Sequence, residues 1–231
     1  VRLMSRVFMK TESLQAYQEG VALMSVGKYR QAREKFDHIL DQERDNLEIL
    51  IRSAQCYVLE ADYDSAVEKL QQARRLNPFE PQVHLWLGRT LYLRGQVDEA
   101  LIELREAQPL QLSDERAVVW LAEALVASGN GSGALDLLSR HVLQNPDQLE
   151  AVLLHARMRL SVPQNDRTQG AQLRKQIEST LKKLDAQEAY PASVRATSDL
   201  GFFLERSSSE LRADLVRMQD SLLRRAEAAR Y

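Results

Sequence analysis

The residue types that most often carry chemistry are few in this 231-residue chain, and their spacing does not suit catalysis or metal binding. No two histidines stand four residues apart, the spacing that places two imidazoles on one helix face for a metal ion. A single cysteine, Cys56, can form neither an intrachain disulfide nor a cysteine metal cluster, and we expect it to be a small packed hydrophobic residue. Packing or surface roles are expected for the four histidines, His38, His84, His141 and His155.

Enzyme motifs are also missing from the sequence. It contains no glycine-rich phosphate loop, nucleophile elbow or paired-cysteine motif. The acidic pairs Asp98-Glu99 and Asp114-Glu115 stand where helices are expected to begin, and carboxylates there stabilise the helix dipole. We therefore expect no catalytic residues, no cofactor and no metal, and we expect that the protein is not an enzyme.

The charge balance limits the class of partner. The chain has 31 Lys and Arg against 33 Asp and Glu, a net charge of −2, which does not suit a basic nucleic-acid-binding face. No segment approaches the roughly 20 apolar residues of a membrane-spanning helix. We expect a protein or peptide partner, no nucleic acid and no direct membrane insertion. A cytoplasmic location is predicted, with the periplasm or a tether to a membrane assembly as alternatives. Because the sequence begins without Met, we also expect a fragment or processed form.

Small residues recur every 34 positions along most of the chain. A second series follows twelve residues later at the same interval, with Ala32, Ala66, Ala100 and Ala134. Such a period is typical of stacked supersecondary units rather than of a closed globule. The first series is Gly20, Ala54, Gly88, Ala122 and Ala156.

Each repeat is predicted to be a pair of short amphipathic helices. Apolar residues three and four apart indicate the helices, and Gly27, Gly95 and Gly129 indicate turns that need a left-handed backbone. Pro78 and Pro146 close two of the units, because proline cannot continue a helix. The predicted units are residues 13–46, 47–80, 81–114 and 115–148.

The pattern weakens after residue 148. Residues 149–160 are predicted to form the first helix of a fifth unit, and further helices are expected at 168–188, 192–205 and 207–230. Terminal units of such arrays are atypical because they must cover the exposed end of the core. The predicted organisation is an N-terminal segment at 1–12, four repeats at 13–148, and degenerate repeats with capping helices at 149–231.

The repeated pattern of Leu/Ala-Gly-x-x-Leu/Tyr, then Gly-x-Tyr-x-x-Ala-x-x-x-Phe/Leu-x-x-Ala-Leu and a final Pro, resembles the tetratricopeptide repeat over residues 13–148. The resemblance implies an all-α fold, a right-handed superhelical solenoid of antiparallel helix pairs with degenerate or extended C-terminal helices. It also implies that positions two, five, nine and twelve of each first helix line a concave groove.

The resemblance assigns a peptide-binding groove to this chain. Some family members hold acidic chaperone tails with a Lys and an Asn in the first unit; Tyr17 and Val21 stand at those places, so that clamp is absent. Apolar stripes beside a polar one favour a peptide with an apolar face. The predicted groove residues are Tyr17, Val21, Met24, Ile51, Gln55, Leu85, Arg89, Tyr92, Val119 and Glu123.

The predicted function is a non-catalytic protein–protein interaction module that binds an apolar or amphipathic peptide segment in this groove. In one alternative, the groove side chains only pack against neighbouring helices or are covered by the N-terminal segment. In another, the chain is a structural or assembly subunit, or an accessory domain, of a larger multiprotein or secretion complex, and associates with itself.

Overall fold

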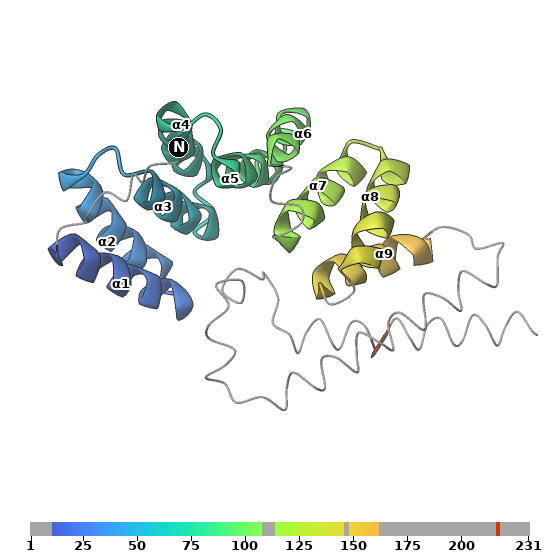
Figure 1. The fold of residues 1–231 in the computed structure, drawn as a ribbon, viewed down its shortest axis with the longest axis horizontal. Coiled ribbons are helices and arrows are strands. Elements are labelled where there is room, and N and C mark those ends of the chain that lie inside the picture. The colour runs from blue at the N-terminus through green and yellow to red at the C-terminus, as the bar shows by residue number, and fades with distance from the viewer. Residues whose placement is uncertain (1–10, 108–113, 146–147, 162–215, 218–231) are drawn as a thin grey trace, which may run out of the picture. The chain divides into compact units, whose positions relative to one another are not determined.

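The computed structural model describes residues 11–107, 114–145, 148–161 and 216–217, and every regular element in these ranges is an α-helix (Figure 1). The chain forms two compact units, Val1–Leu110 and Gln111–Tyr231, which we describe separately. The first unit contains α1 (Thr11–Ser25), α2 (Tyr29–Gln42), α3 (Leu47–Leu59), α4 (Tyr63–Leu76), α5 (Pro81–Leu93) and α6 (Val97–Glu106). The second contains α7 (Glu115–Ala127), α8 (Gly131–Gln144) and α9 (Leu149–Ser161).

Consecutive helices pair as antiparallel hairpins, α1 with α2, α3 with α4, α5 with α6 and α7 with α8. In the first unit, α1, α3 and α5 lie along one side and α2, α4 and α6 along the other (Figure 1). We call these the inner and outer helices of that unit. The prediction of an all-α fold built from repeated helix pairs is confirmed.

Each hairpin closes with a turn that contains one residue in the left-handed region. Gly27, Gly95 and Gly129 have φ of 74°, 83° and 86°, as the sequence predicted. Ala61 occupies the equivalent place in the second hairpin with φ of 61°. A residue with a Cβ atom in the left-handed region costs about 1–2 kcal/mol of stability. The packing of the second hairpin offsets this cost at Ala61, whereas glycine would form the turn without strain.

Side-chain caps set the starts of several helices. Oδ1 of Asn46 accepts a hydrogen bond from the Ile49 amide at 3.3 Å at the start of α3. Oδ1 of Asp62 accepts one from the Ser65 amide at 3.2 Å at the start of α4. These bonds satisfy amides that have no partner inside the helix. They therefore determine where the helices begin.

The repeated small residues let the two helices of a hairpin approach closely. A Cβ added at Gly20 would lie 2.7 Å from Cε1 of Phe36, and one added at Gly88 would lie 2.6 Å from Cγ of Leu104. Ala54, at the equivalent position of α3, is fully buried. The large side chains that fill these places also repeat every 34 residues and have no accessible surface: Phe36, Leu70, Leu104 and Leu138.

In the second unit, a carboxylate of α7 caps the start of α9. Oε1 of Glu115 accepts a hydrogen bond from the Ala151 amide at 2.8 Å. Burial raises the pKa of Glu115 to about 7; this amide acts in the opposite direction, and Glu150 and Asp114 add to the rise. A titratable group therefore connects α7 to α9.

The predicted first helix at 149–160 is confirmed as α9. The helices predicted at 168–188 and 192–205, the N-terminal segment at 1–12 except its last two residues, and nearly all of the helix at 207–230 lie outside the described residues. The predicted domain boundary at residue 148 stays a prediction, and the boundary between the compact units falls earlier, between Leu110 and Gln111.

Candidate partner-binding surface

The 34-residue period places most of the predicted groove residues on the inner helices of the first unit. Tyr17, Val21 and Met24 lie on α1, Ile51 and Gln55 on α3, and Leu85, Arg89 and Tyr92 on α5. Val119 and Glu123 lie on α7, in the second unit. We therefore consider the eight residues of the first unit as one surface.

Burial divides these eight residues into two groups. Tyr17, Val21 and Tyr92 are half-buried and keep side-chain surface accessible to a partner. The other five are buried, and Leu85 has no accessible surface at all. In the second unit, Val119 is buried and Glu123 is half-buried. The buried members are Met24, Ile51, Gln55, Leu85 and Arg89.

Tyr17 connects α1 to both of its neighbours. Its hydroxyl donates a weak hydrogen bond to Oε1 of Glu48 on α3 at 3.4 Å, and its ring centroid lies 6.1 Å from that of Phe36 on α2, tilted by 56°. Burial raises the pKa of the Tyr17 hydroxyl, which therefore stays protonated and able to donate at neutral pH. The ring is thus oriented before any partner arrives.

Two charged residues beside Tyr17 were not among the predicted groove residues. Nε of Arg52 donates to Oε1 of Glu48 at 2.7 Å, one helical turn apart on α3. Burial lowers the pKa of Arg52, but Glu48 and Tyr17 raise it more, and the net direction is upward. Glu48 stands at position two of its helix, one of the four positions that line the groove in the family, so this pattern could have identified it. Arg52 occupies the sixth position of its helix, which the pattern does not include.

On α5, the side chains of Arg89 and Tyr92 lie against each other. The guanidinium carbon of Arg89 lies 5.4 Å from the centroid of the Tyr92 ring, within the range of a cation–π contact. Aromatic and arginine side chains of this kind carry much of the free energy of protein interfaces. The inner surface therefore offers stacking and hydrogen bonding rather than acid–base chemistry.

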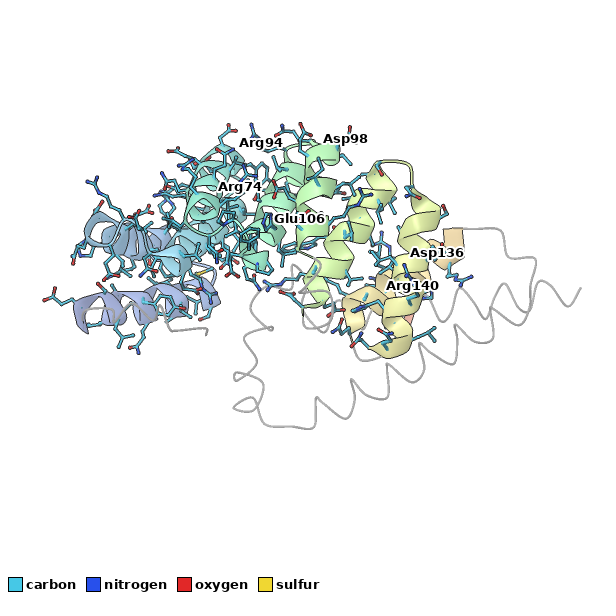
Figure 2. The ribbon with its side chains drawn as sticks, turned by 45° about the horizontal axis from the view of Figure 1, so that its top comes forward. Arg74, Arg94, Asp98, Glu106, Asp136 and Arg140 are labelled. Atoms are coloured by element: carbon cyan, nitrogen blue, oxygen red, sulfur yellow. The ribbon has the colours of Figure 1, made fainter. Side chains whose placement is uncertain are left out.

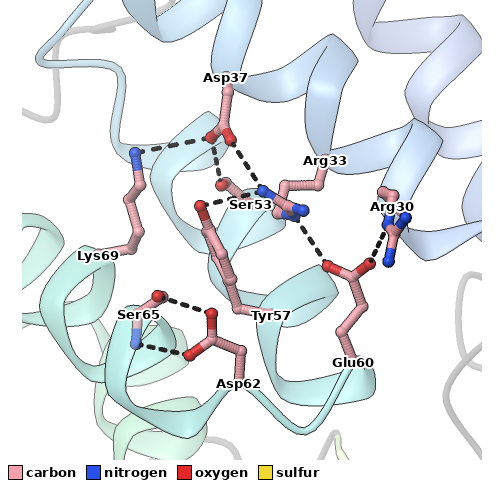
Figure 3. Close-up of polar contacts among 9 residues, drawn as sticks. All are labelled: Arg30, Arg33, Asp37, Ser53, Tyr57, Glu60, Asp62, Ser65 and Lys69. Carbon is pink, nitrogen blue, oxygen red and sulfur yellow. Dashed lines mark hydrogen bonds and ion pairs between the residues drawn. The ribbon is translucent and has the colours of Figure 1, made fainter.

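A polar network on α2 and α3 braces the first two repeats (Figure 3). Nε of Arg33 donates to Oε2 of Glu60 at 2.8 Å, and the Arg33 guanidinium lies 4.6 Å from the centroid of the Tyr57 ring. Ser53 donates to Oδ1 of Asp37 at 2.7 Å. These partners satisfy one another, so the network stabilises the stacking of α2 on α3.

Arg74 and Arg94, both labelled in Figure 2, each form an ion pair with a neighbouring helix. Nη1 of Arg74 on α4 donates to Oε1 of Glu103 on α6 at 2.7 Å. Nη2 of Arg94, just after α5, lies 2.9 Å from Oδ1 of Asp64 on α4. Both pairs hold consecutive helix pairs together.

The buried histidines and Cys56 contribute to packing. His84 bonds to Glu103 and to the Pro78 carbonyl, and Nε2 of His155 lies 3.0 Å from Oγ of Ser139. Burial and then Arg159 lower the pKa of His155 to about 4, so its ring is neutral at neutral pH. Cys56 has no accessible surface, and burial raises its pKa to about 12. An unreactive, packed thiol agrees with the expectation from the sequence.

Over the part of the chain that the structure describes, no group of three or more His, Cys, Asp or Glu side chains could hold a metal ion. Among the same residues, no helix has both the length and the apolar character needed to cross a membrane.

The described helices define an all-helical repeat protein. Two family models described as tetratricopeptide repeat match residues 23–68 and 60–115. Residues 23–115 therefore match the tetratricopeptide repeat, and the predicted resemblance is confirmed. No curated protein is similar enough in sequence to count as a relative.

Solved structures share this fold at low sequence identity. PilW, described as a widely conserved type IV pilus biogenesis factor, has a TM-score of 0.64 at 17% identity, with 95% of this chain and 94% of PilW covered. Yeast Tom70 has a TM-score of 0.66 at 18% identity, covering 94% of this chain and 41% of Tom70. MamA from Desulfovibrio magneticus RS-1 has a TM-score of 0.60 at 15% identity, covering 78% and 99%. At these identities the likeness concerns the fold alone.

Proposed function

We propose that the inner face of α1, α3 and α5 binds a segment of another protein that presents an apolar or amphipathic surface. Helical-repeat folds offer extended surfaces to other proteins, and this general role follows from the family. The observation that supports the specific site is the accessible surface of Tyr17, Val21 and Tyr92, which stand at the predicted groove positions five, nine and twelve of their helices. Arg52 beside Tyr17 is half-buried and adds a cationic, hydrogen-bonding group, whereas the buried Arg89 lies against the ring of Tyr92.

Within this proposal the two tyrosines are the anchors. The Phe36 contact orients Tyr17, and the Arg89 contact orients Tyr92. A side chain that is oriented before binding loses less conformational entropy when the partner arrives. Leu85 supports the surface from beneath, whereas Val119 and Glu123 of the second unit remain predicted contributors.

The test is selection of a display library of 15-residue peptides on the full chain, followed by affinity measurements on the selected peptides. We expect peptides with an apolar face, and a loss of about 10-fold or more in affinity for Tyr17→Ala and for Tyr92→Ala, since a good anchor contributes about 2 kcal/mol. Ile102→Ala is the matched control, because Ile102 is an exposed apolar residue of outer helix α6. Unchanged affinity in Tyr92→Ala and Arg89→Ala would mean that the site is assigned wrongly.

The assembly alternative makes a different prediction for the chain alone. A self-associating subunit would sediment as larger species when its concentration rises, because open contacts between repeat ends can propagate. A monomer at every concentration would count against that alternative and leave the peptide-binding proposal unaffected.

A further inference from the structure

The outer side of the first unit contains a pocket that the inner-face proposal does not use. The pocket lies between outer helices α2 and α4, has a volume of about 520 Å³, and is open to solvent. Leu40 and Leu50 in its lining are buried, and Leu76 at its edge is 42% exposed. A volume of this size lies in the usual range of ligand pockets, about 300–1,000 Å³.

Comparison with the next pair of outer helices explains why the pocket exists. Thirty-four residues after Leu40, Leu50 and Lys69 stand Arg74, His84 and Glu103. Those three form an ion-paired cluster between α4 and α6, with Glu103 at 2.7 Å from both Arg74 and His84.

Between α2 and α4, the three equivalent residues are two leucines and a lysine. The leucines cannot make polar bonds across the gap, and Lys69 reaches only Oδ1 of Asp37, at 3.6 Å (Figure 3). This contact is longer than those of the α4/α6 cluster, and its carboxylate is 32% exposed against 12% for Glu103. The gap therefore keeps an apolar floor.

Charges of both signs surround this floor. Asp41 on α2 and Asp45 just after this helix continue the acidic side that Asp37 begins, with the cation Arg44 next to Asp45, and Arg75 lies with Lys69 on the α4 side. Asp41, Asp45 and Arg75 make no ion pair with any described residue. An occupant could therefore pair with them without displacing an existing contact.

We propose that the α2/α4 pocket is a second protein-binding site, for a segment in which an apolar side chain stands between a cationic and an anionic one. The apolar side chain would cover Leu40 and Leu50, the cation would face Asp41 and Asp45, and the anion would face Arg75. The lining carries three carboxylates and three cations, so it lacks the excess of positive charge that binds nucleic-acid phosphates or anionic lipid surfaces. The exposed edge at Leu76 favours a protein segment, which buries apolar surface beyond the pocket.

The experiment sorts a library of 12-residue display peptides on the full chain and on charge-reversed variants. We expect a class of peptides whose affinity falls at least 10-fold for Asp41→Lys and for Arg75→Glu, both exposed positions. Exchanging the two charges within the peptide should recover part of that loss in the double variant Asp41→Lys/Arg75→Glu. The matched control is Glu106→Lys, an exposed carboxylate at the end of α6 where a cation suits the helix dipole (Figure 2).

A second variant closes the pocket and leaves Asp41, Asp45 and Arg75 unchanged. Leu40→Arg/Lys69→Glu introduces at the α2/α4 position the pair that joins α4 to α6, and thermal unfolding checks that this protein folds. Loss of the same peptide class supports the proposal. The proposal is overturned if no peptide responds to both Asp41→Lys and Arg75→Glu, or if the closed variant folds and binds such peptides normally. Because Tyr17→Ala and Tyr92→Ala act on the inner face, they separate failure of that proposal from failure of this one.

Discussion

Nδ1 of His84 lies 2.7 Å from Oε2 of Glu103, and this contact joins α5 to α6 at a place where the preceding repeat has only leucine and lysine. The other carboxylate oxygen of Glu103 accepts a hydrogen bond from Arg74, also at 2.7 Å. One carboxylate thus holds residues of α4 and α5 to α6. Its partners would lose their bonds together if it were removed.

We therefore expect Glu103→Gln to destabilise the protein by about 1–3 kcal/mol, because polar groups at His84 and Arg74 would be left poorly paired. The triple variant Arg74→Leu/His84→Leu/Glu103→Leu removes every member of the cluster and should cost less, since replacing an ion-paired cluster by apolar residues is often close to neutral. Denaturant unfolding measures both proteins. A triple variant less stable than Glu103→Gln would contradict this explanation.

The close approach of inner and outer helices at Gly20 and Gly88 leads to the next prediction. Each added methyl group would overlap a fully buried side chain, Phe36 or Leu104. Gly20→Ala and Gly88→Ala should each destabilise the protein by about 1–3 kcal/mol despite the better helix propensity of alanine. Gly131→Ala is the control, because a Cβ there meets nothing within 4 Å. Thermal melting compares the three variants, and equal melting temperatures would contradict the predicted overlap.

Glu115 should make the stability of the second unit depend on pH. Its pKa is raised from 4.5 to about 7 in the folded state, mainly by burial, so the folded protein binds more protons than the unfolded chain between these values. The free energy of unfolding should consequently fall as pH rises from about 4.5 to 7, by up to about 3 kcal/mol.

Glu115→Gln can still accept the Ala151 hydrogen bond but does not titrate. The difference in unfolding free energy between wild type and Glu115→Gln, measured by denaturant titration at several pH values, isolates the contribution of this group. It should be constant below about pH 4 and change steadily up to about pH 7. A difference that is the same across this range would contradict the assigned role.

Much of the fold was predictable because its determinants are local. Gly27, Gly95 and Gly129 adopt the left-handed turns that the sequence indicated, and the predicted helix at 149–160 is present as α9. Ala61 was not anticipated as a left-handed residue, since propensity alone does not place alanine there. Its position 34 residues after Gly27 and before Gly95 was the signal that could have revealed it.

The surface was predicted less completely. The repeat rule placed Tyr17 and Tyr92 on the inner helices but could not indicate that Leu85 and Arg89, at equally regular positions, are buried. It also omitted Arg52, whose role depends on contacts with Glu48 and Tyr17. Burial depends on everything that packs over a residue, and a period along one chain does not contain that information.

The sequence by itself determined the paired helices, their interval of 34 residues and the small residues that let each pair close, because these depend on contacts between neighbours in the chain. Only the tertiary structure decided which side chains remain accessible. It also decided that a pocket lies at Leu40, Leu50 and Lys69, whereas the equivalent residues of the next repeat, Arg74, His84 and Glu103, form a bonded cluster. The physical reason is that accessibility and ion pairing depend on distances between helices, which residue types and spacing do not specify.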